Sequence, residues 1–74
     1  MNRLDELMAE LFPDEAPLPP ETPFREYETW DSLKHVHLVV GIESRFALDL
    51  SADEIAGLGS KHAVEELLRA KGAA

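Results

Sequence analysis

The residue best placed to take part in a chemical reaction is a serine. It lies at the junction between a proline-rich stretch and an apolar run with helical spacing. Asp31, Ser32 and Leu33 occupy this junction. Asp31 has the short acceptor side chain that satisfies the first free backbone amides of a helix. Ser32 then falls in the first turn, near unpaired amides and the positive end of the helix dipole, which favour an anionic group attached to its hydroxyl.

The histidines near this serine do not complete a catalytic or metal site. His35 follows Ser32 by three residues, so the two side chains are close enough on a helix to act as nucleophile and base. However, His35 points with the apolar residues of that helix, and no third group or oxyanion hole is evident. His35 and His37 lie about 160° apart around a helix, so they cannot share a metal ion. We therefore predict no catalytic residue, no metal ligand and no enzyme activity.

The residues from 31 to 46 predict a helix that contacts more than one surface. At about 100° per residue, one apolar group falls between about 240° and 340° and another between about 40° and 100°. This arc is wider than the single stripe of a surface helix. The first group would face the other helices and the second would form an exposed edge for docking; the alternative is that the second is ordinary core. The groups are Leu38, Val39, Ile42 and Phe46, and Leu33, Val36 and Val40.

The polar side of the same helix also has two interpretations. A solvated face is favoured, and electrostatic docking of a partner is the alternative. Its residues are Lys34, His37, Ser44 and Arg45.

Three further helices complete the expected fold. The first has an apolar stripe between Asn2, a cap, and Pro13, a stop. A short helix begins with a capping box formed by Ser51 and Glu54 and ends by Gly57. The last runs from a Ser60 cap to Gly72. The stripe of the first helix is Leu4, Leu7, Met8, Leu11 and Phe12, and that of the last is Ala63, Val64, Leu67 and Leu68.

The connector between the first two helices is long and rich in proline. All five prolines lie within residues 13–23, which predicts a stiff, extended segment. Phe24, Tyr27 and Trp30 follow at three-residue spacing and are expected to pin the connector onto the core, the alternative being direct ligand contact. The predicted fold is all-α, a single domain over residues 1–74: a small four-helix bundle with three main helices, one short helix and a long loop between the first two.

Composition narrows the classes of partner. The chain has 74 residues, a formal charge of −8 and no cysteine. Such a charge repels nucleic acid and anionic lipid, and no apolar run approaches the roughly 20 residues that span a bilayer. Without cysteine the chain has no disulfide and no thiol of its own, which together with the lack of a signal peptide favours the cytoplasm.

The order of these elements and several motifs resemble acyl carrier proteins. The motifs are the Asp31-Ser32-Leu33 turn, the run Leu33-x-x-Val36-x-Leu38-Val39-Val40 and the continuation Glu43-x-x-Phe46. The resemblance covers nearly the whole chain and is most specific over residues 30 to 58. It implies that a phosphopantetheinyl transferase attaches 4′-phosphopantetheine from coenzyme A to Ser32, with Asp31 and Leu33 beside it. Acyl or related groups are then carried as thioesters on the thiol of that arm.

The same resemblance implies that the second helix recognises partners. Leu33, Val36 and Val40 match the exposed apolar contacts of the family, and Lys34, His37 and Glu43 lie beside them. The implied partners are acyl- or aminoacyl-activating enzymes and downstream transferases or synthases, which would meet a monomeric carrier.

The chain departs from the family at two places. It has Glu28-Thr29-Trp30 where the family often has a glycine before the aspartate, which predicts Trp30 as a buried anchor. Fatty-acid members carry acids where this chain has Lys34 and His37, and only Glu43 keeps that character. We therefore expect a specialised pathway, such as a polyketide, modified amino-acid or small hydroxyacyl route. The competing class is an unmodified helical adaptor that binds proteins through the exposed apolar edge.

Overall fold

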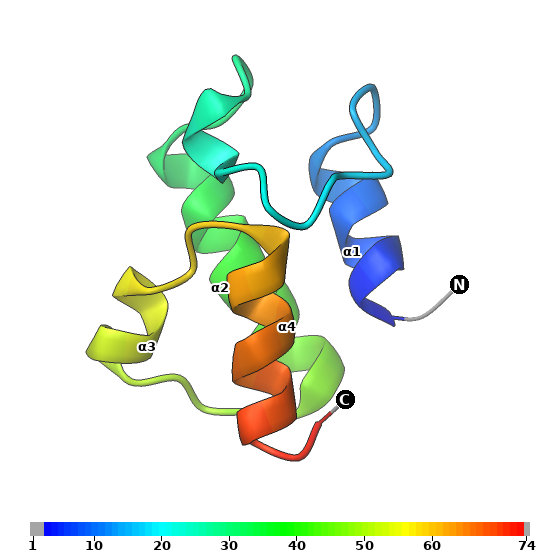
Figure 1. Cartoon of the computed structure of the whole chain (residues 1–74). Helices are drawn as coiled ribbons and strands as arrows, with labels where there is room; N and C mark the ends of the chain where they lie inside the picture. The colour runs from blue at the N-terminus through cyan, green and yellow to red at the C-terminus, as the bar shows by residue number, and fades with distance from the viewer. Residues whose placement is uncertain (1–2, 74) are drawn as a thin grey trace.

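Helices account for all the regular elements in the computed structural model, which describes residues 3–73 (Figure 1). The elements are α1 (Arg3–Leu11), the 3-10 helix η1 (Phe24–Glu26), α2 (Ser32–Phe46), α3 (Ala52–Ala56) and α4 (Lys61–Ala70). Between residues 3 and 73 the only β-type pairing is an isolated bridge from Pro23 to Ser60. The predicted all-α bundle, with three main helices and one short helix, is confirmed. The predicted cap Asn2 lies outside the described residues.

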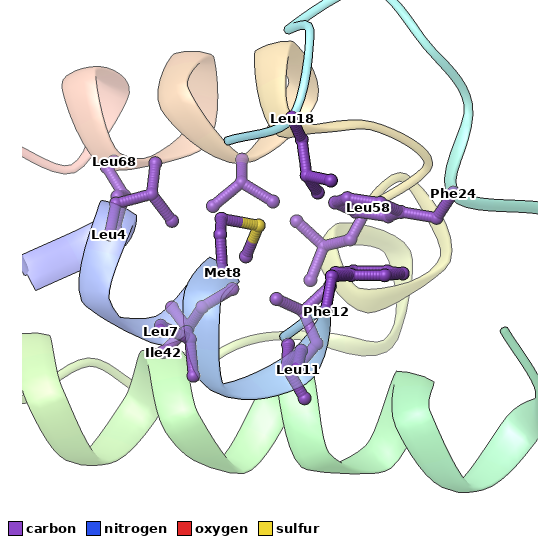
Figure 2. Close-up of a cluster of buried hydrophobic side chains, with 12 residues drawn as sticks. Leu4, Leu7, Met8, Leu11, Phe12, Leu18, Phe24, Ile42, Leu58 and Leu68 are labelled. Atoms are coloured by element: carbon purple, nitrogen blue, oxygen red, sulfur yellow. The ribbon is translucent and has the colours of Figure 1, made fainter. Parts of the chain in front are cut away.

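The core forms where α1 packs between α2 and α4, as Figure 2 shows. Leu7 and Leu11 of α1 point towards α2, whereas Leu4 lies beside Leu68 of α4. Leu38 and Ile42 of α2 are fully buried, and Val39 and Phe46 are half-buried against the core. The apolar group predicted to face the other helices therefore does so.

Glycine at position 41 allows α1 and α2 to approach closely. A Cβ atom at Gly41 would lie 2.6 Å from Cδ1 of Leu7 and 3.1 Å from its Cδ2. Real Cβ contacts are not this short, so any side chain here requires Leu7 to move. At this point α1 and α2 are closer than a larger residue allows without a shift of the Leu7 side chain.

Side-chain caps start three of the helices where the sequence predicts them. The Asp31 carboxylate accepts a hydrogen bond from the Lys34 amide at 2.8 Å. Ser51 and Glu54 form the predicted capping box of α3, which ends at Gly57. Ser60 Oγ accepts from the Ala63 amide at 3.1 Å at the start of α4. These caps depend on local spacing alone, which is why the sequence reveals them.

The proline-rich segment over residues 13–23 is not extended throughout, because turns interrupt it at residues 13–15 and 20–21, so that prediction is wrong for part of the segment. The 3-10 helix η1 follows directly after it. The Phe24 amide donates to the Gly59 carbonyl at 2.8 Å, and the His62 amide donates to the Pro20 carbonyl at 2.9 Å. These backbone hydrogen bonds fasten the connector to the segment that joins α3 and α4 and to the first turn of α4. The 3-10 helix η1 then lies beside the N-terminal end of α2 (Figure 1).

Candidate functional site

Ser32 is the first residue of α2, and it is exposed. The first intrahelical hydrogen bond of α2 runs from the His35 amide to the Asp31 carbonyl at 3.1 Å. The Asp31 carboxylate accepts a hydrogen bond from the Lys34 amide. The amides of Ser32 and Leu33 come before the first donor of the helix, so they have no partner within it. The serine hydroxyl is thus accessible at a helix end where the backbone favours negative charge.

An aromatic cluster fixes the residue that precedes this helix. The Trp30 ring stacks on Phe24 with centroids 4.9 Å apart and on Phe12 with centroids 5.9 Å apart. Its amide donates to the Tyr27 carbonyl at 3.0 Å. Phe24 is buried, and Tyr27 and Trp30 are half-buried against the core. The prediction that these aromatics pin the connector is confirmed, whereas Trp30 is not the fully buried anchor that was expected. Rigid packing next to Asp31 holds the cap, and with it Ser32, in a defined place.

His35 belongs to this packing. It is half-buried, and its ring meets Trp30 edge-on at 5.9 Å with an interplanar angle of 87°. No hydrogen bond joins His35 to Ser32 among the hydrogen bonds of the described residues. Within residues 3–73, no three His, Asp or Glu side chains are grouped so that they could hold a metal ion.

The second apolar group of α2 is exposed. Leu33, Val36 and Val40 expose 60%, 53% and 57% of their surface, and His37 beside them is exposed. The interpretation of these aliphatic residues as ordinary core is wrong, because the helices that bury Leu38 and Ile42 lie on the opposite side of α2. An unpartnered aliphatic edge therefore begins one residue after Ser32.

Two of the four residues of the expected solvated face, Lys34 and Arg45, are half-buried and contact α1, and Glu43, which was expected beside the docking edge, is also half-buried. Lys34 Nζ donates to the Leu11 carbonyl at the end of α1 and lies 5.1 Å from the centre of the Phe12 ring. Glu43 Oε2 accepts from the Leu50 amide at 3.0 Å. Arg45 pairs with Glu10 of α1. His37 and Ser44 are the remaining exposed members of the predicted polar side.

A groove of about 350 Å³ opens next to the start of α2. Trp30 and His35, both within three residues of Ser32, line it together with Phe24, Arg25 and Leu58. These residues come from η1, the loop before α2, α2 itself and the segment after α3. No local sequence pattern indicates the groove, because its walls are distant in the sequence and meet only after the connector has folded onto α4.

One carboxyl group outside this region has a shifted acidity. The pKa of Glu54 is lowered, chiefly because the Ser51 amide donates to its carboxylate, and Lys71 strengthens the effect. The Ser51 amide lies 2.8 Å from Glu54 Oε1, and Lys71 Nζ lies 2.9 Å from Oε2. This group stabilises the cap of α3 and takes no part in the site at Ser32.

Comparisons with known proteins add no relatives. Scans against protein-family models, curated proteins and solved structures found no match to this chain. No helix within residues 3–73 combines the length and the apolar character needed to cross a membrane.

Proposed function

We propose that the protein is an acyl carrier protein that carries 4′-phosphopantetheine on Ser32. The observation that supports this most directly is the exposed hydroxyl of Ser32 in the first turn of α2, behind the Asp31 cap. The resemblance in sequence assigns the attachment to the same residue. Asp31 and Leu33 would flank the attached arm and present it to the modifying enzyme.

The residues around Ser32 fit such an arm. The unpaired amides of the first turn would favour its phosphodiester, and the groove beside Trp30 and His35 offers an apolar wall near the attachment point. When bound, the arm supplies a thiol on which acyl groups are held as thioesters. The chain has no cysteine, so it contributes no competing thiol and acts by holding and presenting the arm.

Modification of Ser32 is tested by intact mass. The purified chain is incubated with a phosphopantetheinyl transferase and coenzyme A, next to Ser32→Ala and Ser44→Ala. Ser44 is also an exposed serine of α2, so it is a matched control. We expect the wild type and Ser44→Ala to gain one phosphopantetheine and Ser32→Ala to gain none. An unmodified wild type, or a modified Ser32→Ala, would exclude the proposal.

The outer face of α2 favours a specialised pathway. Glu43 is the one acid of α2, and it accepts a hydrogen bond from the Leu50 amide. Lys34 is a cation and contacts the end of α1. The helix therefore offers partners no row of carboxylates. Enzymes that recognise such a row would bind this helix poorly. We therefore place the carrier in a polyketide, modified amino-acid or small hydroxyacyl route, with adenylating or acyl-transferring enzymes as partners.

An unmodified helical adaptor is the second candidate function. The exposed edge formed by Leu33, Val36 and Val40 favours it, because such an edge suits protein binding with or without an arm. An adaptor would keep its unmodified mass in the experiment above, so the same measurement separates the two functions.

A further inference from the structure

A second pocket lies at the end of the bundle remote from Ser32, where the start of α1 meets the ends of α2 and α4. It measures about 470 Å³, within the range of about 300–1,000 Å³ that is typical of small-molecule sites. Phe46, the last residue of α2, lines this pocket, and Ser32 is the first residue of the same helix. The two are separated by about 21 Å along the helix axis. The pocket is therefore distinct from the candidate site at Ser32.

The floor of this pocket is apolar. Leu4 of α1 and Leu68 of α4 are buried and lie beside each other (Figure 2). Phe46 at the end of α2 and Ala73 after α4 are half-buried, and all four side chains line the pocket. Such a floor suits an apolar side chain of a small ligand.

The remaining lining consists of three charged residues, Arg3, Glu65 and Arg69. Arg3 Nη1 donates to the Arg45 carbonyl at 2.9 Å, which holds the guanidinium in place and leaves most of its five N–H donors free for a ligand. Arg69 pairs with Glu66 at 2.6 Å, although Glu65 lies one turn before it. Within residues 3–73, Glu65 has no hydrogen bond or ion pair, and it is half-buried.

The opposite charges of this pocket are held apart, which favours a zwitterionic ligand. In the part of the chain that the structure describes, Arg3 and Glu65 form no ion pair with each other. Each can therefore take an opposite charge from a ligand. A purely anionic ligand would be repelled by Glu65 and by the formal charge of −8, and a purely cationic one by the two arginines. A zwitterion has no net charge and meets neither penalty.

We infer that this pocket binds a free α-amino acid with an apolar side chain. Arg3 binds the carboxylate of the ligand, Glu65 binds its ammonium group, and the side chain packs on Phe46 and Leu68. Hydrogen bonds between charged groups are stronger than those between neutral ones, so the two ends of the ligand fix its orientation above the apolar floor. The site does not depend on the proposed carrier function, because it shares no residue with the site at Ser32.

Titration of the full, unmodified chain followed by nuclear magnetic resonance tests the site. The probe is L-phenylalanine. Two analogues each lack one of its charges, since 3-phenylpropionate has no ammonium group and phenethylamine has no carboxylate. Glu65→Gln and Arg3→Gln remove the two pocket charges. Glu28→Gln and Arg25→Gln remove exposed charges outside the pocket and are the matched controls. The amide spectrum of each variant also reports whether it is folded.

We expect saturable shifts at the amides of Phe46, Leu68 and Ala73. L-phenylalanine should bind at least about tenfold more tightly than either analogue, a difference of about 1.4 kcal/mol. Glu65→Gln and Arg3→Gln should each weaken its binding by at least about tenfold, and the two controls should leave it unchanged. Glu65→Gln should not weaken the binding of 3-phenylpropionate, because that analogue has no ammonium group for Glu65 to bind.

Three results would overturn the inference. The first is a wild type that shows no saturable shift with L-phenylalanine up to its solubility limit. The second is equal affinity for the three ligands, which would mean apolar contact alone. The third is an affinity for L-phenylalanine that survives both pocket substitutions. If a variant does not fold, the comparison of the three ligands on the wild type still decides the question. None of these results affects the modification of Ser32, which intact mass tests separately.

Discussion

Asp31 combines a hydrogen-bond acceptor with a negative charge at the start of α2. Its carboxylate accepts from the Lys34 amide at 2.8 Å. Asn is as good a cap as Asp, whereas Ala lacks the acceptor. We expect Asp31→Ala to lower the free energy of unfolding by about 1 kcal/mol and Asp31→Asn to leave it nearly unchanged, as measured by urea denaturation. Equal losses in the two variants would contradict a capping role.

Lys34 stabilises the contact between α1 and α2. Its ammonium group donates to the Leu11 carbonyl and lies over the Phe12 ring. We expect Lys34→Met, which keeps an apolar stem, to lower the free energy of unfolding by about 1–2 kcal/mol. Arg25→Met, which removes an exposed cation of η1, is the control and should change it by less than about 0.5 kcal/mol. Similar losses in both variants would mean that Lys34 has no special role.

Sequence reasoning identified side chains with local partners and missed those with distant partners. The Asp31 cap and the Ser51–Glu54 box involve neighbours within three residues, so spacing alone predicts them. Lys34 and Glu43 were expected beside a docking edge. Their actual partners, the Leu11 carbonyl and the Leu50 amide, depend on where α1 ends and how the chain leaves α2, and no local pattern encodes either.

At the scale of elements, the packing of α1 on α2 depends on Gly41. Gly41→Ala gains up to about 1 kcal/mol of helix propensity, but its Cβ would lie 2.6 Å from Cδ1 of the buried Leu7, and overpacking costs about 1–3 kcal/mol. We expect a net loss of about 1 kcal/mol in urea denaturation. Gly59→Ala, where a Cβ meets nothing within 4 Å, is the control and should not destabilise. A more stable Gly41→Ala would contradict the close approach.

The start of α3 should be sensitive to acid through Glu54. The Ser51 amide and Lys71 lower the pKa of Glu54 in the folded chain, so its ionised form favours folding. This stabilisation is complete above the pKa of an unfolded glutamate and is lost as the pH falls through the lower folded pKa. We expect Glu54→Gln to be less stable than wild type at about pH 6 and the two to converge towards about pH 3. Glu28→Gln, at an exposed acid, is the control. If Glu54→Gln differed from wild type in stability by the same amount at both pH values, the lowered pKa would be contradicted.

The elements themselves were largely predictable, and the connector was not. Apolar periodicity and caps located α2 and the starts of α3 and α4, because these signals are local. The prolines of residues 13–23 indicated an extended segment, yet this segment turns at residues 13–15 and 20–21. The hydrogen bonds of Phe24 and His62 to Gly59 and Pro20 couple it to α4, and that tertiary constraint overrides the extended preference of the prolines.

For the whole molecule, net charge opposes folding at low ionic strength. A formal charge of −8 is confined within a radius of gyration of 11.2 Å, close to the Debye length of about 10 Å at 0.1 M salt. Isolated surface ion pairs contribute only about 0–1 kcal/mol each. Salt should therefore weaken the repulsion between like charges by more than it weakens the attraction within these ion pairs. We expect the urea midpoint to rise between about 0.01 and 0.3 M NaCl, most steeply below about 0.1 M. A falling midpoint would show that the ion pairs dominate.

A count of thiols gives the most direct test of the proposed carrier function, because the chain has no cysteine and any thiol on it would have to come from an attached arm. The protein is treated with coenzyme A and a phosphopantetheinyl transferase, freed of small molecules and titrated with a thiol reagent. The carrier function requires one reactive thiol per chain in the wild type and none in Ser32→Ala. A wild type without a thiol, or a Ser32→Ala chain that acquires one, contradicts the account.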